Sequence, residues 1–195
     1  MKSLETINGV QEGLDLEIAI QNVVASASVN QEFNLEDIMK NFMNTEYRPK
    51  RFPGLVFRLK RPKTATLIFS TGKMVCTGAK SEKLAIAAVN KVVKELKAGG
   101  IIVLGKPVIT IQNIVASANL QNKVDLETAA DLLDNVMYEP EQFPGLIYRM
   151  SDPKTVLLLF SSGKIVCTGG KSEKIVHNSV NNLYELLDDY DLFYK

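Results

Sequence analysis

Apolar and polar positions alternate along several short stretches of the chain. Residues 16–27 alternate in this way and carry many β-branched side chains, which predicts a β-strand. Three short β-rich runs, at 55–60, 65–70 and 73–78, predict further strands. Turn residues separate these runs, at Pro62-Lys63 and Thr71-Gly72.

Helix start signals flank these strands. Asn34 and Asp125 are N-cap residues that precede early acids and an apolar-periodic stretch, so a helix begins after each of them. Ser81 and Ser172 have the same role before a longer helix, SEKLAIAAVNKVVKEL in the first case. The order of elements, strand, helix, several antiparallel strands and helix, predicts an α+β unit with helices on one face of a sheet.

The chain is an internal duplication. A shift of 91 residues aligns IQNVVASA at 20–27 with IQNIVASA at 111–118, and FPGLVFR at 52–58 with FPGLIYR at 143–149. Without a gap, 37 of the 83 positions from 16 to 98 are identical to their partners in the second copy, which is far above chance. A period of this length indicates a duplicated domain half rather than a solenoid repeat.

The duplication defines the expected domain organisation. The segment 97–106, KAGGIIVLGK, has three glycines and is interpreted as the hinge between the copies. The expected parts are an N-terminal extension (1–15), the first repeat (16–98), a linker (99–106), the second repeat (107–189) and an acidic and aromatic C-terminal tail (190–195).

Helices on one face leave the other face of the sheet uncovered. Because side chains alternate across a strand, Asn22, Val24 and Ser26 share a face. Leu67 and Phe69 join that face, as do Val75 and Thr77, whereas Cys76 points to the other side. An open apolar face of this kind is a binding surface or a dimer interface, and the residues alone leave both open.

Charge is divided unequally between the copies. Residues 1–98 carry 15 Lys and Arg against 10 Asp and Glu, a net charge of +5, and residues 99–195 carry 8 against 12, a net charge of −4. The whole chain is therefore near neutral, and its bulk charge does not indicate a nucleic-acid-binding protein. Binding to a polyanion would depend on where individual cations lie.

Composition is typical of soluble globular proteins, with 46% apolar and 23% charged residues. No apolar run is long enough to span a bilayer, and the first residues contain no signal-peptide-like apolar region. Cys76 and Cys167 occupy equivalent places and are expected to be free thiols. We expect an intracellular, cytoplasmic protein that does not associate with membranes.

The repeated strings closely resemble the TATA-box-binding protein family. QNVVAS and QNIVAS, RFPGLVFR and QFPGLIYR, and IFSTGKMVCTGAKSEK and LFSSGKIVCTGGKSEK carry the resemblance, which spans roughly residues 16–189. The short N-terminal extension, the near-symmetric halves and the ending LLDDYDLFYK are similar to the archaeal branch. The resemblance implies a pseudo-two-fold saddle, with a ten-stranded antiparallel sheet and helices on its convex face. In an archaeal cell it also implies association with the nucleoid.

The resemblance further implies that the concave face binds the minor groove of an A/T-rich promoter element in double-stranded DNA and bends it. Two phenylalanine pairs match the wedges that unstack base steps: Phe52, Phe69, Phe143 and Phe160. Ten residues match the base-edge contacts: Asn22, Asn113, Val24, Val115, Leu67, Leu158, Val75, Val166, Thr77 and Thr168. Eight match phosphate contacts: Arg58, Arg149, Lys73, Lys164, Lys80, Lys171, Thr71 and Ser162.

The two loops that carry FPG differ in charge. YRPKRFPG is basic, whereas YEPEQFPG at 138–145 is acidic. In the family the second of these loops receives transcription factor B, which implies Glu139, Glu141 and Gln142 as partner contacts and RNA polymerase as an indirect partner. Gln142 stands where the family often has an apolar residue.

Enzymatic and metal-binding motifs are absent from the sequence. TGGKSEK lacks the first glycine of a phosphate-binding P-loop, because Ile165 stands there. The single His177 and two distant cysteines make no zinc site or catalytic pair. We expect no enzymatic activity and no cofactor. The alternatives to DNA binding are a small-molecule or peptide carrier that uses the concave face, or a homodimer that occludes it.

Overall fold

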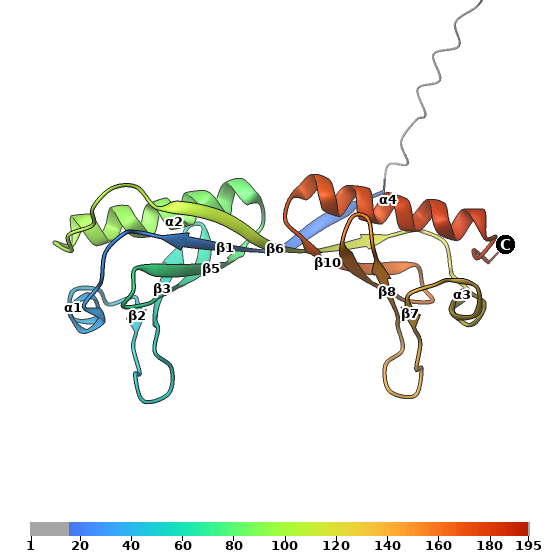
Figure 1. Ribbon diagram of the computed structural model, residues 1–195, viewed down its shortest axis with the longest axis horizontal. Coiled ribbons are helices and arrows are strands. Elements are labelled where there is room, and N and C mark those ends of the chain that lie inside the picture. Colours follow the sequence, from blue (N-terminus) through green and yellow to red (C-terminus); the bar gives the residue numbers. More distant parts are fainter. Residues whose placement is uncertain (1–15, 195) are drawn as a thin grey trace, which may run out of the picture.

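The computed structural model describes residues 16–194, which form one ten-stranded antiparallel sheet with four helices (Figure 1). The first repeat comprises β1 (Ile18–Ser28), α1 (Leu35–Asn41), β2 (Thr45–Glu46), β3 (Leu55–Lys60), β4 (Lys63–Ile68), β5 (Lys73–Ala79) and α2 (Glu82–Ala98). The second comprises β6 (Val108–Asn119), α3 (Leu126–Leu132), β7 (Val136–Met137), β8 (Leu146–Met150), β9 (Thr155–Leu159), β10 (Lys164–Gly170) and α4 (Glu173–Asp189). The predicted α+β class and the duplication are confirmed.

Strand order in the sheet is β2-β3-β4-β5-β1-β6-β10-β9-β8-β7. The two halves are therefore related by a pseudo-two-fold axis at the β1–β6 pair. Figure 1 shows an arch in which α2 and α4 lie along the convex side and the β2–β3 and β7–β8 loops project below the sheet. The arrangement is the saddle that the resemblance implied.

The local pattern predicted most strands but missed the two edge strands. Observed β3 coincides with the predicted run 55–60, whereas β4 begins two residues earlier than the predicted run because Lys63 is already paired with Lys60. The edge strands β2 and β7 have two residues each, which is too short to show a period.

All four predicted helix starts are confirmed. The Asn34 side chain accepts hydrogen bonds from the Glu36 and Asp37 amides, and Asp125 accepts from Thr128. Ser81 and Ser172 cap α2 and α4 by accepting from the amides of the third residue after each cap. These bonds satisfy donors that would otherwise lack an intrahelical partner.

Each repeat has its own apolar core between the sheet and its long helix. In the first repeat Val89, Val92 and Leu96 of α2 are fully buried against β-strand residues such as Phe57 and Ile68. Val176, Val180, Leu183 and Leu187 of α4 do the same in the second repeat. Ile18 and Ile20 pack against the second core, so the beginning of β1 completes the other repeat.

The linker and the C-terminal segment are attached to the body of the fold. The Gln31 side chain donates to the Ile102 carbonyl at 2.6 Å and accepts from the Leu104 amide at 2.5 Å. Leu192 is buried, and Phe193 forms an isolated bridge with Val124. None of the helices in the described part of the chain is both long and apolar enough to cross a bilayer.

Candidate nucleic-acid interface

Within residues 16–194, the long helices α2 and α4 lie on the convex side and no helix covers the concave face of the sheet. Along β1, Val23, Ala25 and Ala27 are buried on the convex side, whereas Val24 and Ser26, which alternate with them, are partly exposed. The same alternation follows β5, where Met74 and Cys76 are buried and Val75 and Thr77 are partly exposed. The face assignment predicted from the period of two is therefore observed.

Cross-strand pairing arranges the concave residues in matching rows. In the first repeat Leu67 pairs with Val75, and Val75 pairs with Ser26. In the second repeat Leu158 pairs with Val166, and Val166 pairs with Ser117. All ten predicted base-edge residues are partly exposed: Asn22, Asn113, Val24, Val115, Leu67, Leu158, Val75, Val166, Thr77 and Thr168.

The central asparagines are held by their own repeats. Asn22 Oδ1 accepts from the Gly78 amide at 2.7 Å, and Asn22 Nδ2 donates to Thr77 Oγ1 at 3.0 Å. Asn113 repeats both contacts with Gly169 and Thr168, at 2.8 and 3.2 Å. Because a side-chain amide has two N–H groups, each Asn keeps one donor beyond its bond to the threonine hydroxyl. Gly78 has φ of +100°, a backbone conformation that favours glycine and brings its amide to Asn22.

The four candidate wedges form two aromatic pairs with one geometry. Phe52 and Phe69 have ring centroids 5.8 Å apart at 66°, and Phe143 and Phe160 have the same distance and angle. Phe52 is 39% exposed and the other three rings are partly exposed. A Cβ on Gly54 would lie 2.6 Å from the Phe52 ring and 3.1 Å from the Phe69 ring. The glycine of FPG is therefore required for the two rings to pack together.

The candidate phosphate ligands are exposed and surround the concave face. Arg58 and Arg149 lie on β3 and β8, Lys73 and Lys164 begin β5 and β10, and Thr71 and Ser162 are in the preceding turns. Lys80 Nζ donates to the Gln21 carbonyl at 2.8 Å, which holds this cation beside β1. Lys171 is exposed at the equivalent position after β10.

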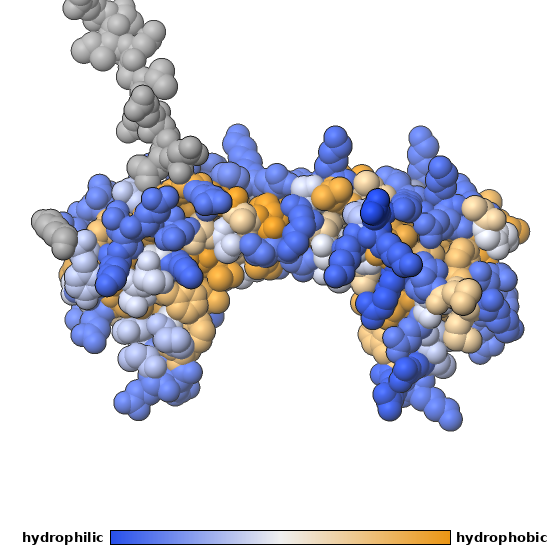
Figure 2. Space-filling view, turned by 180° about the vertical axis from the view of Figure 1, so that it is seen from behind, coloured by the Kyte–Doolittle hydropathy of each residue, from blue (hydrophilic) through white to orange (hydrophobic). Residues whose placement is uncertain are grey.

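The two projecting loops carry opposite charge but share the same backbone hydrogen bonds. In the second loop Gln142 and Phe143 both donate their amides to the Glu139 carbonyl at 2.9 Å, and Glu139, Glu141 and Gln142 are exposed. In the first loop the Arg48 guanidinium pairs with Glu46 at 2.9 Å. The space-filling view shows hydrophilic loop tips below the arch and apolar surface on the flanks above them (Figure 2).

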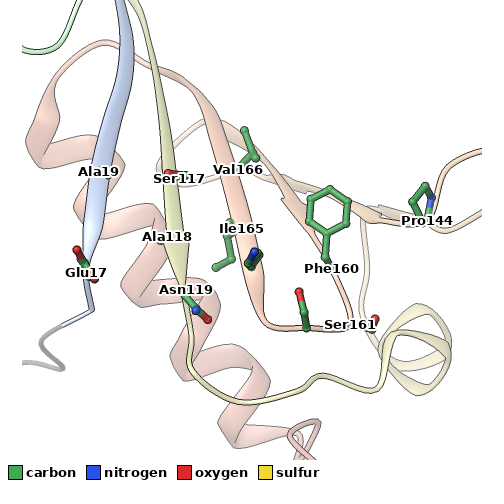
Figure 3. Close-up of a pocket in the computed structure, with 12 residues that line it drawn as sticks. Glu17, Ala19, Ser117, Ala118, Asn119, Pro144, Phe160, Ser161, Ile165 and Val166 are labelled. Atoms are coloured by element: carbon green, nitrogen blue, oxygen red, sulfur yellow. The ribbon is translucent and has the colours of Figure 1, made fainter.

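A hollow on the concave side of the second repeat brings predicted contact residues, among them Phe160 and Lys164, together with residues that the sequence analysis did not name. It is lined by Glu17, Ala19, Ser117, Ala118, Asn119, Pro144, Phe160, Ser161, Ser162, Lys164, Ile165 and Val166. Figure 3 shows Glu17, which immediately precedes β1, on the side of the sheet that also carries Asn119 and Phe160. Alignment of the two repeats would have drawn attention to Glu17, because it is an acid where the second repeat has the apolar Val108.

The potential metal ligands and thiols of the described residues do not gather on the concave face. Among them, no three His, Cys, Asp or Glu residues lie close enough to hold a metal ion. Burial raises the pKa of the Cys76 thiol and raises the pKa of Cys167 to about 11, so both thiols are protonated core groups. Neither faces the concave side.

Comparison with known proteins gives one consistent result. Residues 17–98 and 108–190 each match the family model described as transcription factor TFIID, or TATA-binding protein. The chain is 56% identical over 168 residues to the TATA-box-binding protein of Pyrodictium occultum, which covers 86% of this chain and 84% of the relative. It is 53% identical over 174 residues to that of Sulfurisphaera tokodaii, covering 89% and 88%.

A solved structure with the same fold is Methanococcus jannaschii TBP. It superposes with a TM-score of 0.81 at 47% sequence identity and covers 89% of this chain and 99% of that chain.

Proposed function

Because the chain belongs to the TATA-box-binding protein family, a family of transcription initiation factors, we propose that its concave face binds the minor groove of an A/T-rich promoter element and bends it. Members of this family are the established example of bending by apolar wedges in the minor groove. The chain would act inside the cell, on the chromosome, and without an enzymatic step.

One observation carries the proposal: the concave face presents the candidate wedges and the central asparagines twice, with nearly the same geometry. The Phe pairs have equal centroid distances, and the two asparagines make the same two bonds with their own repeats. Each half of the protein is therefore built to contact one half of a short duplex. A carrier for one small ligand would have no need of two sets of cations around the same face.

The central side chains suit A·T pairs. Both A·T and T·A present only acceptors in the minor groove, and the remaining N–H of Asn22 or Asn113 is able to donate to either. Val24, Val75 and their second-repeat equivalents supply apolar surface that leaves a guanine amino group without a partner. The predicted result is selectivity for A/T over G/C without discrimination between A and T.

The phenylalanine pairs supply the bending. An inserted ring replaces part of the stacking that a base step loses, and unstacking costs a few kcal/mol per step. Each partly exposed ring rests on its partner and on the glycine below it, so it enters the duplex as a rigid group. Opening the groove lets more of the concave surface contact the DNA.

The cations around the face supply affinity that depends on salt. Arginine and lysine side chains that neutralise phosphates release condensed counterions, so log K falls with log salt by about 0.9 per phosphate. Six cations occupy candidate positions: Arg58, Arg149, Lys73, Lys164, Lys80 and Lys171. If each neutralises one phosphate, the slope is about −5.

The bending role is tested by energy transfer across a labelled A/T-rich duplex with Phe52→Ala and Phe143→Ala. We expect each substitution to reduce the bend, and the matched control Tyr194→Ala, which removes an exposed ring at the C-terminal end, to leave it unchanged. Unchanged bending in both phenylalanine variants would remove the wedge role.

The acidic loop is the proposed contact for transcription factor B, which would in turn bring RNA polymerase. Glu139 and Glu141 are exposed on a loop that projects away from the sheet and are therefore accessible while DNA fills the concave face. Glu139→Arg should abolish the ternary complex with transcription factor B in a gel shift and leave the binary complex intact. An undiminished ternary complex with Glu139→Arg would contradict the assignment.

Pairing of two free copies through the same apolar face stays a prediction. Sedimentation of the protein with and without A/T-rich duplex tests it: a dimer that DNA converts to a protein–DNA complex with one copy supports the pairing, and a monomer at all concentrations excludes it.

A further inference from the structure

One row of the concave face differs in charge between the repeats. In the first repeat Lys73 pairs with Ser28, and Ser28 pairs with Val108. In the second repeat Lys164 pairs with Asn119, and the residue aligned with Val108 is Glu17. The half of the face that carries Lys164 therefore has an acid, Glu17, where the half that carries Lys73 has the apolar Val108.

The direction of the Glu17 side chain follows from the register of β1. Ala19 pairs with Ser117, and directly opposed residues in an antiparallel pair lie on the same face. Ser117 is on the concave side, since it pairs with Val166, and Glu17 lies two residues before Ala19. Glu17 also lines the same hollow as Phe160 and Lys164 (Figure 3).

The Glu17 carboxylate is exposed, and within residues 16–194 no ion pair within 4.0 Å is found for it. Val108 is 73% exposed at the equivalent place. The two halves of the face therefore share their wedges and base-edge residues but differ by one full negative charge beside a phosphate candidate, Lys164.

We propose that Glu17 tunes the affinity of the DNA-binding face: its charge weakens the binding of the half that carries Lys164 to the DNA backbone and makes the two halves of the interface electrostatically unequal. The proposal rests on the proposed function, because it requires that DNA occupies the concave face. It assigns the half of the face that carries Lys73 and Val108 as the half that binds DNA more strongly.

The physical reason is repulsion between Glu17 and the phosphates drawn to Lys164. At about 0.1 M salt the screening length is about 10 Å, so a carboxylate at that distance from a phosphate still raises the free energy of the complex. One such charge changes the dissociation constant by about two- to five-fold at this salt and by less at higher salt. Shape and apolar contact stay the same when the charge alone is removed.

Two matched pairs of proteins isolate this charge. Wild type is compared with Glu17→Gln, and Val108→Glu is compared with Val108→Gln, so that each pair differs only by one carboxylate at an equivalent place. Affinity for an A/T-rich duplex and for a G/C-substituted control is measured by fluorescence anisotropy from 0.1 to 0.5 M salt. We expect Glu17→Gln to bind the A/T-rich duplex about two- to five-fold more tightly at 0.1 M salt, with a ratio that approaches one as salt rises.

We expect Val108→Glu to bind more weakly than Val108→Gln by a similar factor, because it places the same charge on the first half. Equal or weaker binding by Glu17→Gln overturns the proposal, as does a Val108→Glu protein that binds as well as Val108→Gln. Failure of the proposed function gives a different result, in which wild type does not prefer the A/T-rich duplex over the control at any salt concentration.

Discussion

Replacing Glu173 by alanine removes one half of a reciprocal contact between the repeats. Glu173 Oε1 accepts from the Glu82 amide at 3.0 Å, and Glu82 Oε1 accepts from the Glu173 amide at 2.6 Å. Figure 1 shows the N-terminal ends of α2 and α4 facing each other above the centre of the sheet. Each glutamate therefore satisfies a free amide at the positive end of the other repeat's helix.

The expected size follows from the type of bond. A hydrogen bond to a charged acceptor contributes about 1.5–3 kcal/mol, and loss of an N-terminal cap costs about 1 kcal/mol. Because both glutamates are only partly buried and their carboxylates repel each other, we expect about 1 kcal/mol for Glu173→Ala and the same for Glu82→Ala. For a chain of this size that lowers the Tm by about 2–4 °C.

The double variant measures the coupling free energy between the two substitutions, whose sign the single variants cannot give. Each single substitution loses one bond but also relieves the repulsion between the carboxylates. The double variant loses both bonds and relieves the repulsion only once, so its cost should exceed the sum of the single costs by about 0.5 kcal/mol.

The assay is urea unfolding of the four proteins at one salt concentration, with Glu36→Ala as the control. Glu36 is also a first-turn glutamate but is exposed on α1. If Glu82→Ala and Glu173→Ala destabilise the protein no more than Glu36→Ala does, the reciprocal contact does not stabilise the junction. A double variant that costs less than the sum would contradict the repulsion argument.

Two further substitutions test the wedge support and the buried thiols. Gly145→Ala places a Cβ 2.7 Å from the Phe143 ring and 3.1 Å from the Phe160 ring, so it should displace both rings and reduce DNA bending. Gly105→Ala is the control: its Cβ meets nothing within 4 Å, and although its φ of +73° strains the linker locally, bending should be unchanged. Burial raises the pKa of Cys167 from 9.0 to about 11, so above pH 9 the unfolded chain loses a proton that the folded chain keeps, and stability falls. Urea unfolding between pH 8 and pH 11 should show that Cys167→Ala removes about 2 kcal/mol of this alkaline loss, and equal pH slopes for both proteins would rule it out.

Much of the fold was predictable because the same local sequence patterns occur in both repeats. The N-caps Asn34 and Ser81, and their counterparts in the second repeat, all begin helices, and the period of two along β5 assigned Val75 and Thr77 to the open face. Repetition made these local signals reliable, since each one had an independent second instance. The Phe pairs were also predicted as pairs, and the structure brings each pair to 5.8 Å.

The direction of Glu17 was not predictable by counting along the strand. The β1–β6 register shifts between Ile20 and Asn22, so the alternation changes phase there. Counting back from Asn22 would place Ile20 on the concave face, yet Ile20 packs against the second core and Ala19 pairs with Ser117. The position of a β-bulge cannot be read from the hydrophobic pattern of a single sequence.

The contact between Glu82 and Glu173 was hidden for a different reason. The two residues are 91 positions apart, and their proximity depends on the pseudo-two-fold axis that brings the helix starts together. A pair of equal charges would ordinarily be expected to stay apart. Here the amides at the two helix ends make the approach favourable.

The central claim is that the duplicated concave face recognises A/T-rich duplex DNA. A gel-shift titration of the full chain against an A/T-rich promoter duplex and a G/C-substituted duplex of equal length tests it directly. We predict at least ten-fold tighter binding to the A/T-rich duplex, because each guanine amino group is left without a partner at about 1–3 kcal/mol. Equal affinity for the two duplexes, or binding to neither, would contradict the account.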